Sequence, residues 1–128
     1  MKRALLLTLL VVLAGCTQYE SVTGHAYVLV EYGGVSPEGL DLSDRTLRIE
    51  NKQGVEYSLV AKSNVKCKNP RRDINTDVGM YQCVGGGGNI TAYGKFISFQ
   101  EYKDILNEQD LIRVVSGYLL VSKIEFVD

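Results

Sequence analysis

Three cysteines, Cys16, Cys67 and Cys83, are the side chains with the widest choice of chemistry in this sequence. A thiolate is a strong nucleophile and a good zinc ligand, and two thiols in an oxidising compartment form a disulfide. Zinc sites usually combine Cys-x-x-Cys pairs with histidines, whereas neither Cys67 nor Cys83 has such a neighbour and His25 is the only histidine. The spacing therefore predicts no metal site and leaves the covalent chemistry of sulfur as the role of the cysteines.

The other polar side chains do not suggest catalysis. No Ser-His-acid or Cys-His set can be assembled around His25, which we expect to be a structural surface residue at the start of a strand. The glycine run Gly85–Gly88 is expected to be a connector rather than a phosphate cradle, because a strand and not a helix should follow it. Acidic residues without the paired spacing of acid–base catalysis include Glu31, Asp41, Asp44 and Asp73. We therefore expect neither enzymatic activity nor a cofactor.

The first residues have the order of an export signal. Met1-Lys2-Arg3 carries two cations, an apolar run extends from Ala4 to Ala14, and small residues precede Cys16. A membrane-spanning helix needs roughly 20 apolar residues, so this shorter run is not expected to remain as a transmembrane anchor. One interpretation is an ordinary secretory signal that is cleaved nearby and leaves Cys16 without a special role.

The segment Leu13-Ala14-Gly15-Cys16 resembles the lipobox of bacterial lipoproteins. The resemblance covers residues 1–16 and implies that a lipid is attached to the Cys16 thiol and that the chain is cleaved just before it. Residues 1–15 are then a signal peptide, 16–23 a lipidated tether and 24–128 a single domain. In this family an Asp after the cysteine usually means retention in the inner membrane, and Thr17 stands there instead. The resemblance therefore implies a cell-envelope protein, at an outer membrane facing the periplasm rather than at the inner membrane.

Acylation of Cys16 would leave Cys67 and Cys83 as a pair in a compartment where disulfides persist. Closing the loop between them is expected to stabilise the fold by roughly 3 kcal/mol. The surrounding residues, 64–89, end in the glycine run, and we expect them to be a mobile loop that this disulfide partly restrains.

The same loop contains the most concentrated basic patch of a chain whose formal net charge is −1; its members are Lys66, Lys68, Arg71 and Arg72. Such a patch can contact anionic lipid headgroups, polysaccharide phosphates or an acidic protein surface. The alternative is a solvated loop whose charges only maintain solubility. The overall charge balance is not that of a nucleic-acid-binding protein.

Alternation of apolar and polar residues predicts a mainly β domain with one helix. Residues 46–50 and 55–61 form the clearest hairpin, joined by a turn that contains Gly54, while residues 35–44 are a loop. Ser98 and Glu101 match a helix capping box, which predicts a short helix near residues 99–107. Further strands are expected at residues 25–32, 90–99, 112–115 and 118–127. Five strand tyrosines suit either a binding surface or a half-exposed sheet, and they are Tyr27, Tyr32, Tyr57, Tyr93 and Tyr118.

Five or six strands with one short helix predict a partly open barrel or a curved antiparallel sheet. The strand order and the glycine-interrupted strands resemble the OB-fold of small exported lipoproteins, in which a glycine bends a strand around the barrel. That family places its helix between the third and fourth strands, whereas the helix predicted at residues 99–107 follows the fourth. The resemblance therefore concerns the fold alone.

Two functions fit these features. The first is a lipid-anchored accessory module that docks onto a larger envelope assembly, such as a secretion, surface-appendage or exclusion system. The second is a lipoprotein whose barrel face or basic loop binds an anionic glycan or lipid. A stable protein partner would favour docking, and a monomer with bound glycan would favour the second function.

Overall fold

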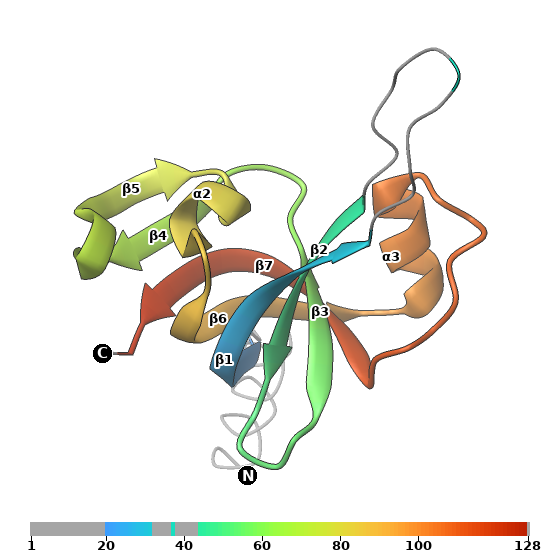
Figure 1. The fold of residues 1–128 in the computed structure, drawn as a ribbon, viewed down its shortest axis with the longest axis horizontal. Coiled ribbons are helices and arrows are strands. Elements are labelled where there is room, and N and C mark those ends of the chain that lie inside the picture. The colour runs from blue at the N-terminus through green and yellow to red at the C-terminus, as the bar shows by residue number, and fades with distance from the viewer. Residues whose placement is uncertain (1–19, 32–36, 38–43, 128) are drawn as a thin grey trace, which may run out of the picture.

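The computed structural model describes residues 20–31, 37 and 44–127, and its fold is mainly β (Figure 1). The signal sequence, Cys16, Tyr32 and most of the predicted loop at residues 35–44 lie outside the described residues. In the described part, seven strands form one sheet in the order β3-β2-β1-β6-β7-β4-β5.

Five of the strands close a barrel. β1 pairs antiparallel with β2 and β6, β2 with β3, and β6 with β7, and a parallel pairing of β3 with β7 completes the circle. The barrel strands are β1 (Glu20–Glu31), β2 (Asp44–Glu50), β3 (Glu56–Val60), β6 (Gly88–Ile97) and β7 (Gly117–Phe126). The barrel predicted from the sequence is thus confirmed, it resembles the OB-fold, and it is closed rather than partly open.

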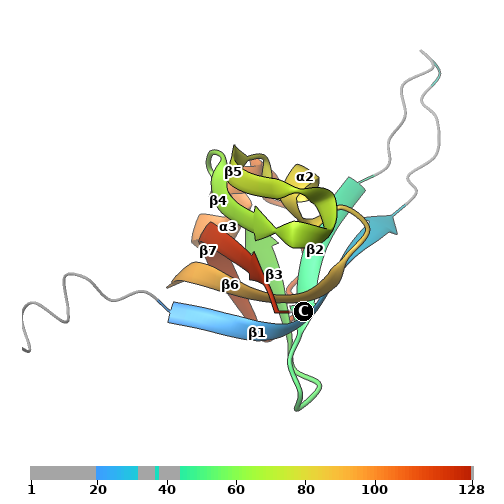
Figure 2. The same ribbon diagram turned by 90° about the vertical axis from the view of Figure 1, so that its left-hand side faces the viewer.

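A hairpin extends the sheet beyond the barrel. β4 (Val65–Asn69) pairs in parallel with the C-terminal half of β7, and β5 (Ile74–Val78) pairs only with β4. A short 3₁₀-helix, η1 (Pro70–Arg72), joins the two strands, and the helix α2 (Met80–Val84) follows them. Figures 1 and 2 show that the hairpin and α2 lie together on one flank of the barrel.

The barrel interior is filled by alternate residues of its strands. Leu47 and Ile49 of β2, Ile90 of β6 and Leu119 of β7 are fully buried, as a period of two requires for strands with one face inward. α2 adds Met80, Cys83 and Val84 to the same core, so this helix closes the barrel on its side.

Gly94 is required because β6 and β7 approach each other closely at this position. A Cβ atom at Gly94 would lie 1.9 Å from the carbonyl oxygen of Leu120, and the register between β6 and β7 shifts between Tyr93 and Gly94. Only glycine allows this approach, and the bulge it permits bends β6 around the barrel.

The helix predicted at residues 99–107 is confirmed as α3 (Phe99–Leu106). The Ser98 hydroxyl accepts a hydrogen bond from the Glu101 backbone amide at 3.0 Å, and Asn107 ends the helix in the left-handed conformation. Tyr102 of α3 packs outside the barrel in a second apolar cluster, whose other buried members are Val60, Val115 and Tyr118.

The prediction of a mobile loop at residues 64–89 was wrong. The run Val65-Lys66-Cys67-Lys68-Asn69 alternates buried and exposed residues and forms β4, while β5 and α2 occupy most of the remainder. The charge of Lys66 and Lys68 suggested a loop. Their spacing of two residues is nevertheless that of the exposed side of a strand. α2 also supplies the helix that the OB-fold resemblance places between the third and fourth barrel strands, so α3 is an additional element.

One predicted strand and one predicted boundary also differ from the structure. Residues 112–115 are not a strand, because no neighbouring strand pairs with them, and Ile112 and Val114 are exposed. β1 begins at Glu20, so the strand includes residues 20–23, which were assigned to the tether.

Candidate functional site

The Cys67–Cys83 disulfide is confirmed, and it joins β4 to α2. Both cysteines are buried in the barrel core, on the side of β4 opposite to its lysines. Asn69 strengthens the same junction, because its side-chain amide donates to the Cys83 carbonyl at 2.8 Å and its oxygen accepts from the Arg71 amide at 3.1 Å. No group of three His, Cys, Asp or Glu residues suited to a metal gathers within the described part of the chain.

The four cations of the predicted basic patch belong to two elements, β4 and η1. Lys66 and Lys68 project from the outer side of β4, where they pair in register with Lys123 and Glu125 of β7. The Arg72 guanidinium instead donates to the Gln82 carbonyl at 3.1 Å, near the end of α2. β4 ends at Asn69 and η1 follows it, so Arg72 lies apart from the two lysines.

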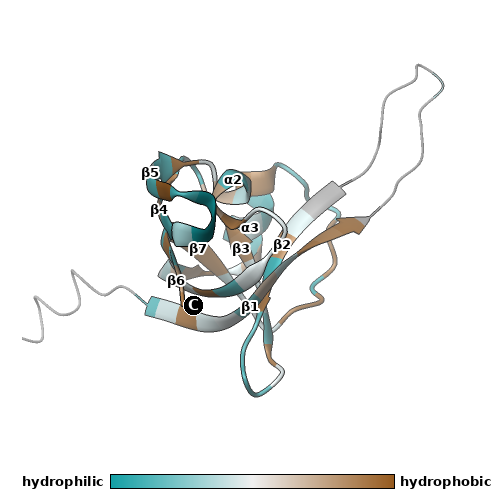
Figure 3. Ribbon diagram, turned by 60° about the vertical axis from the view of Figure 1, so that its left-hand side comes forward, coloured by the Kyte–Doolittle hydropathy of each residue, from teal (hydrophilic) through white to brown (hydrophobic). Residues whose placement is uncertain are grey.

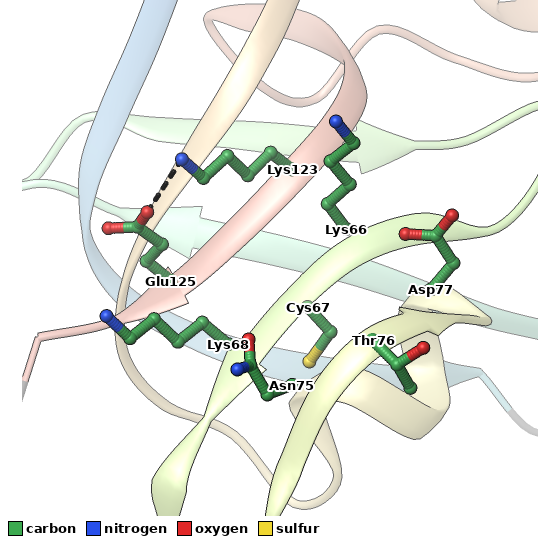
Figure 4. Close-up of a pocket in the computed structure, with 8 residues that line it drawn as sticks. All are labelled: Lys66, Cys67, Lys68, Asn75, Thr76, Asp77, Lys123 and Glu125. Carbon is green, nitrogen blue, oxygen red and sulfur yellow. Dashed lines mark ion pairs between the residues drawn. The ribbon is translucent and has the colours of Figure 1, made fainter.

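A third cation, Lys123 of β7, lies beside Lys66 and Lys68. The spacing of residues in the sequence did not reveal this neighbour. Figure 4 shows Lys66, Lys68 and Lys123 extending from the same side of two neighbouring strands, around a depression of about 300 Å³. The Lys123 ammonium lies 2.7 Å from a carboxylate oxygen of Glu125 and 5.2 Å from the centroid of the Tyr93 ring. The hydrogen bond to Lys123 lowers the pKa of Glu125, and the same bond raises the pKa of Lys123. We call the outer side of β4 and β7 that carries Lys66, Lys68 and Lys123 the lysine face.

A second candidate site lies on the opposite flank, against β2 and β3. One row of paired residues crosses four strands on the outer side of the barrel, with Tyr27 on β1, Arg48 on β2, Ser58 on β3 and Tyr118 on β7. α3 and the connection to β7 pass over this row and leave a groove of about 500 Å³. That volume is within the usual range of ligand-binding pockets, about 300–1,000 Å³.

Arg48 is the charged residue of the groove floor. Its side chain is only 14% exposed, and its guanidinium lies 4.0 Å from one carboxylate oxygen of Glu56, whose other oxygen accepts a hydrogen bond from the Tyr27 hydroxyl. Burial is the main cause of the raised pKa of Tyr27, and its bond to Glu56 adds to that shift. The Arg48 Nε atom is buried and has no hydrogen-bond partner in the described structure. Arg48 lines the groove, so its guanidinium is suited to an oxygen atom of a bound molecule.

Hydroxyl and apolar groups complete the groove. The Tyr102 hydroxyl bonds to Ser58, although burial is the larger effect and raises the pKa of Tyr102. At the rim, Ile112 is 80% exposed and Val114 is 62% exposed, and Leu106 is partly exposed beside them. Acidic residues, Glu108 and Asp110, also border the opening. The groove thus combines a buried cation with an exposed apolar rim.

The remaining predicted residues are spread over the fold, with Tyr118 lining the groove and Tyr93 beside Lys123 on the lysine face. His25 is exposed on β1, beside Glu50 and Asn89 in the register of the neighbouring strands. Tyr118 is buried under α3, Tyr57 contacts Phe96 with tilted rings at a centroid distance of 5.7 Å, and Tyr93 lies beneath Lys123. The described tyrosines therefore do not form one binding surface.

Comparisons with protein-family models, with curated proteins and with solved structures found no match to the chain. Among the described residues, no helix is long and apolar enough to cross a membrane. The fold and the two sites thus define a small OB-like barrel with a groove against β2 and β3 and a lysine-rich face on the other flank.

Proposed function

We propose that the chain is a lipid-anchored envelope protein that docks onto a partner protein through the groove against β2 and β3. The lipobox-like Leu13-Ala14-Gly15-Cys16 supports the anchor, and residues 1–15 are then the cleaved signal peptide. The observation that carries the docking function is Arg48, a largely buried cation in the groove whose Nε has no acceptor among the described residues, beside the exposed apolar side chains of Ile112 and Val114. A binding module fits these features better than an enzyme, because the described residues that line the groove offer one cation and hydroxyls but no nucleophile paired with a base.

This proposal specifies which chemical groups the partner protein must bring to the groove. The partner brings an apolar side chain to Ile112 and Val114 and an oxygen acceptor, from a backbone carbonyl or a carboxylate, to Arg48. OB-fold barrels often use the face of their second and third strands for binding, together with the loop between the fourth and fifth strands. β2, β3 and the α3–β7 connection are the equivalent parts here, which supports the choice of this surface on grounds of analogy.

The test compares two valines of similar exposure. Val114 is 62% exposed at the groove rim and Val127 is 57% exposed after β7, so serine at either position should change stability by less than about 0.5 kcal/mol. Membranes from cells that produce each variant are cross-linked and solubilised in detergent, and the proteins that co-purify are quantified by mass spectrometry. We expect Val114→Ser to reduce one partner strongly and Val127→Ser to leave it at the parent level.

Replacement of Arg48 by Met provides the second arm, because Met keeps the apolar stem and removes the charge and the Nε donor. Loss of the same partner in Arg48→Met would support the proposed acceptor. Equal recovery of every partner with Val114→Ser and with Val127→Ser would refute docking through the groove. Co-purification of a glycan or lipid in place of a protein, lost in Arg48→Met, would favour the alternative of an anionic ligand.

A further inference from the structure

We propose that the lysine face lies against the anionic phospholipid headgroups of the membrane that holds the lipid anchor. This inference rests on the proposed acylation of Cys16, and it assigns an orientation to the barrel. It places the lysine face on the membrane and leaves the groove on the other flank accessible to a partner.

The first argument is the length of the chain between the anchor and the barrel. Only Thr17, Gln18 and Tyr19 separate Cys16 from Glu20, where β1 begins. Even a fully extended chain of this length spans no more than about 14 Å. The barrel therefore cannot move far from the headgroups, and its first strand must stay close to them.

The second argument is the position of β1 relative to the lysines. Ser21, the second residue of β1, pairs with Tyr93 of β6, and Tyr93 pairs with Lys123 of β7, which pairs with Lys66 of β4. These residues share the outer side of the sheet, because paired residues in neighbouring strands point the same way. The short tether thus joins β1 one residue before Ser21, which lies in the same row of residues as the lysine face.

The third argument is the charge of this surface. Lys66 and Lys68 have no ion pair in the described structure, and Lys95 is exposed on β6 after the bulge. The acidic residues of the same region are Glu125, which pairs with Lys123, Asp77, which lies beside Lys66 on β5, and Glu20, whose carboxylate accepts from the Phe96 amide. Four lysines against three carboxylates leave a surface that is weakly positive overall, although the formal net charge of the chain is −1.

The hydropathy of the surface agrees with contact to headgroups rather than with insertion into hydrocarbon. Figure 3 shows the β4–β5 hairpin mostly in the colours of polar residues, and Asn75, Thr76 and Asp77 of β5 are exposed. Exposed lysines near an anionic membrane each contribute about a fivefold shift in the binding equilibrium. With about one net positive charge, this surface should therefore shift the equilibrium between the facing and the tilted orientations by about fivefold.

The experiment uses tryptophan fluorescence, because the chain contains no tryptophan. Tyr93→Trp places the probe on the lysine face, and Tyr81→Trp places a control probe on α2, behind the disulfide and away from that face. The full acylated protein is reconstituted in vesicles of phosphatidylcholine, with or without phosphatidylglycerol, that contain lipids brominated near the headgroup. Mass spectrometry of the reconstituted sample first checks that Cys16 carries its lipid.

We expect strong quenching of the probe at position 93 in vesicles with phosphatidylglycerol and weak quenching in phosphatidylcholine alone. The quenching should decrease in about 1 M salt, where the Debye length is about 3 Å. Lys66→Gln, Lys68→Gln and Lys123→Gln together should remove most of it, whereas Lys52→Gln with Lys103→Gln, on the β2–β3 turn and on α3, should not. The probe at position 81 should stay unquenched in both lipids.

The possible failures separate the two proposals. A chain without lipid on Cys16 would overturn the anchor and this inference with it. An acylated chain whose probe at position 93 is quenched equally in both kinds of vesicle, or less than the probe at position 81, would overturn the orientation alone. Should the triple variant fail to fold, the salt and lipid dependence of the Tyr93→Trp protein still decides the matter.

Discussion

Replacement of Asn69 by Ala should destabilise the protein more than a single polar substitution usually does. Asn69 is 1% exposed, and its side chain bonds both the Cys83 carbonyl, at 2.8 Å, and the Arg71 amide, at 3.1 Å. Leaving the buried carbonyl without a donor costs about 1–3 kcal/mol. Losing the cap of η1 adds about 1 kcal/mol. We expect a total loss of about 2–4 kcal/mol, which corresponds to a decrease in Tm of about 10–20 °C for a domain of this size.

Thermal and urea unfolding monitored by circular dichroism measure this loss, and Asn75→Ala is the matched control. Asn75 is exposed on β5, so its replacement should change stability by less than about 0.5 kcal/mol. Asn69→Asp separates the two bonds, because a carboxylate still accepts from the Arg71 amide but cannot donate to the Cys83 carbonyl. The aspartate variant should be at least as unstable as Asn69→Ala. Equal unfolding midpoints for Asn69→Ala and Asn75→Ala would show that the junction of β4 and α2 does not depend on Asn69.

Three other predictions follow from the same structure. Replacing Cys67 and Cys83 together by Ala should cost roughly 3 kcal/mol and make thermal unfolding insensitive to reductant, and mass spectrometry that finds both thiols free in the parent would refute the disulfide. Gly94→Ala should cost about 3 kcal/mol because of the contact with the Leu120 carbonyl, whereas Gly86→Ala, with open space around it, should unfold like the parent in urea. The pKa of folded Tyr102 is raised above its ordinary value of 10.0, so its contribution to stability is present below about pH 10 and is lost as the pH rises further. Unfolding free energies measured from neutral to alkaline pH should therefore fall less steeply for Tyr102→Phe, and identical slopes would contradict the burial of this hydroxyl.

Local patterns were sufficient to predict part of this fold. The alternation of Leu47 and Ile49 with Arg48, and the capping residue Ser98, predicted a strand and a helix that the structure confirms. Both signals depend on neighbours a few residues apart, which a sequence displays directly. The Cys67–Cys83 disulfide was also predictable, because the predicted export of the chain and acylation of Cys16 would leave a single pair.

Long-range pairing was the part that the sequence did not reveal. β4 lies next to β7 through a parallel pairing across more than fifty residues, and only this pairing brings Lys123 beside Lys66 and Lys68. The groove also depends on contacts between residues that are distant in the sequence. Arg48 alternates outward as any strand residue would, and nothing nearby in the sequence indicates that α3 and the following connection cover it. Both candidate sites are therefore products of topology rather than of local motifs.

The measurement that tests the central claim most directly is the intact mass of the protein extracted from cell membranes. The account predicts a chain that begins at Cys16 and carries the additional mass of attached lipid on that residue. Cys16→Ser should then appear as an uncleaved or soluble chain without lipid, because serine cannot supply the thiolate. A membrane-extracted parent chain with a free Cys16 thiol, or a Cys16→Ser variant that is processed and fractionates like the parent, would contradict the lipid anchor on which both proposals depend.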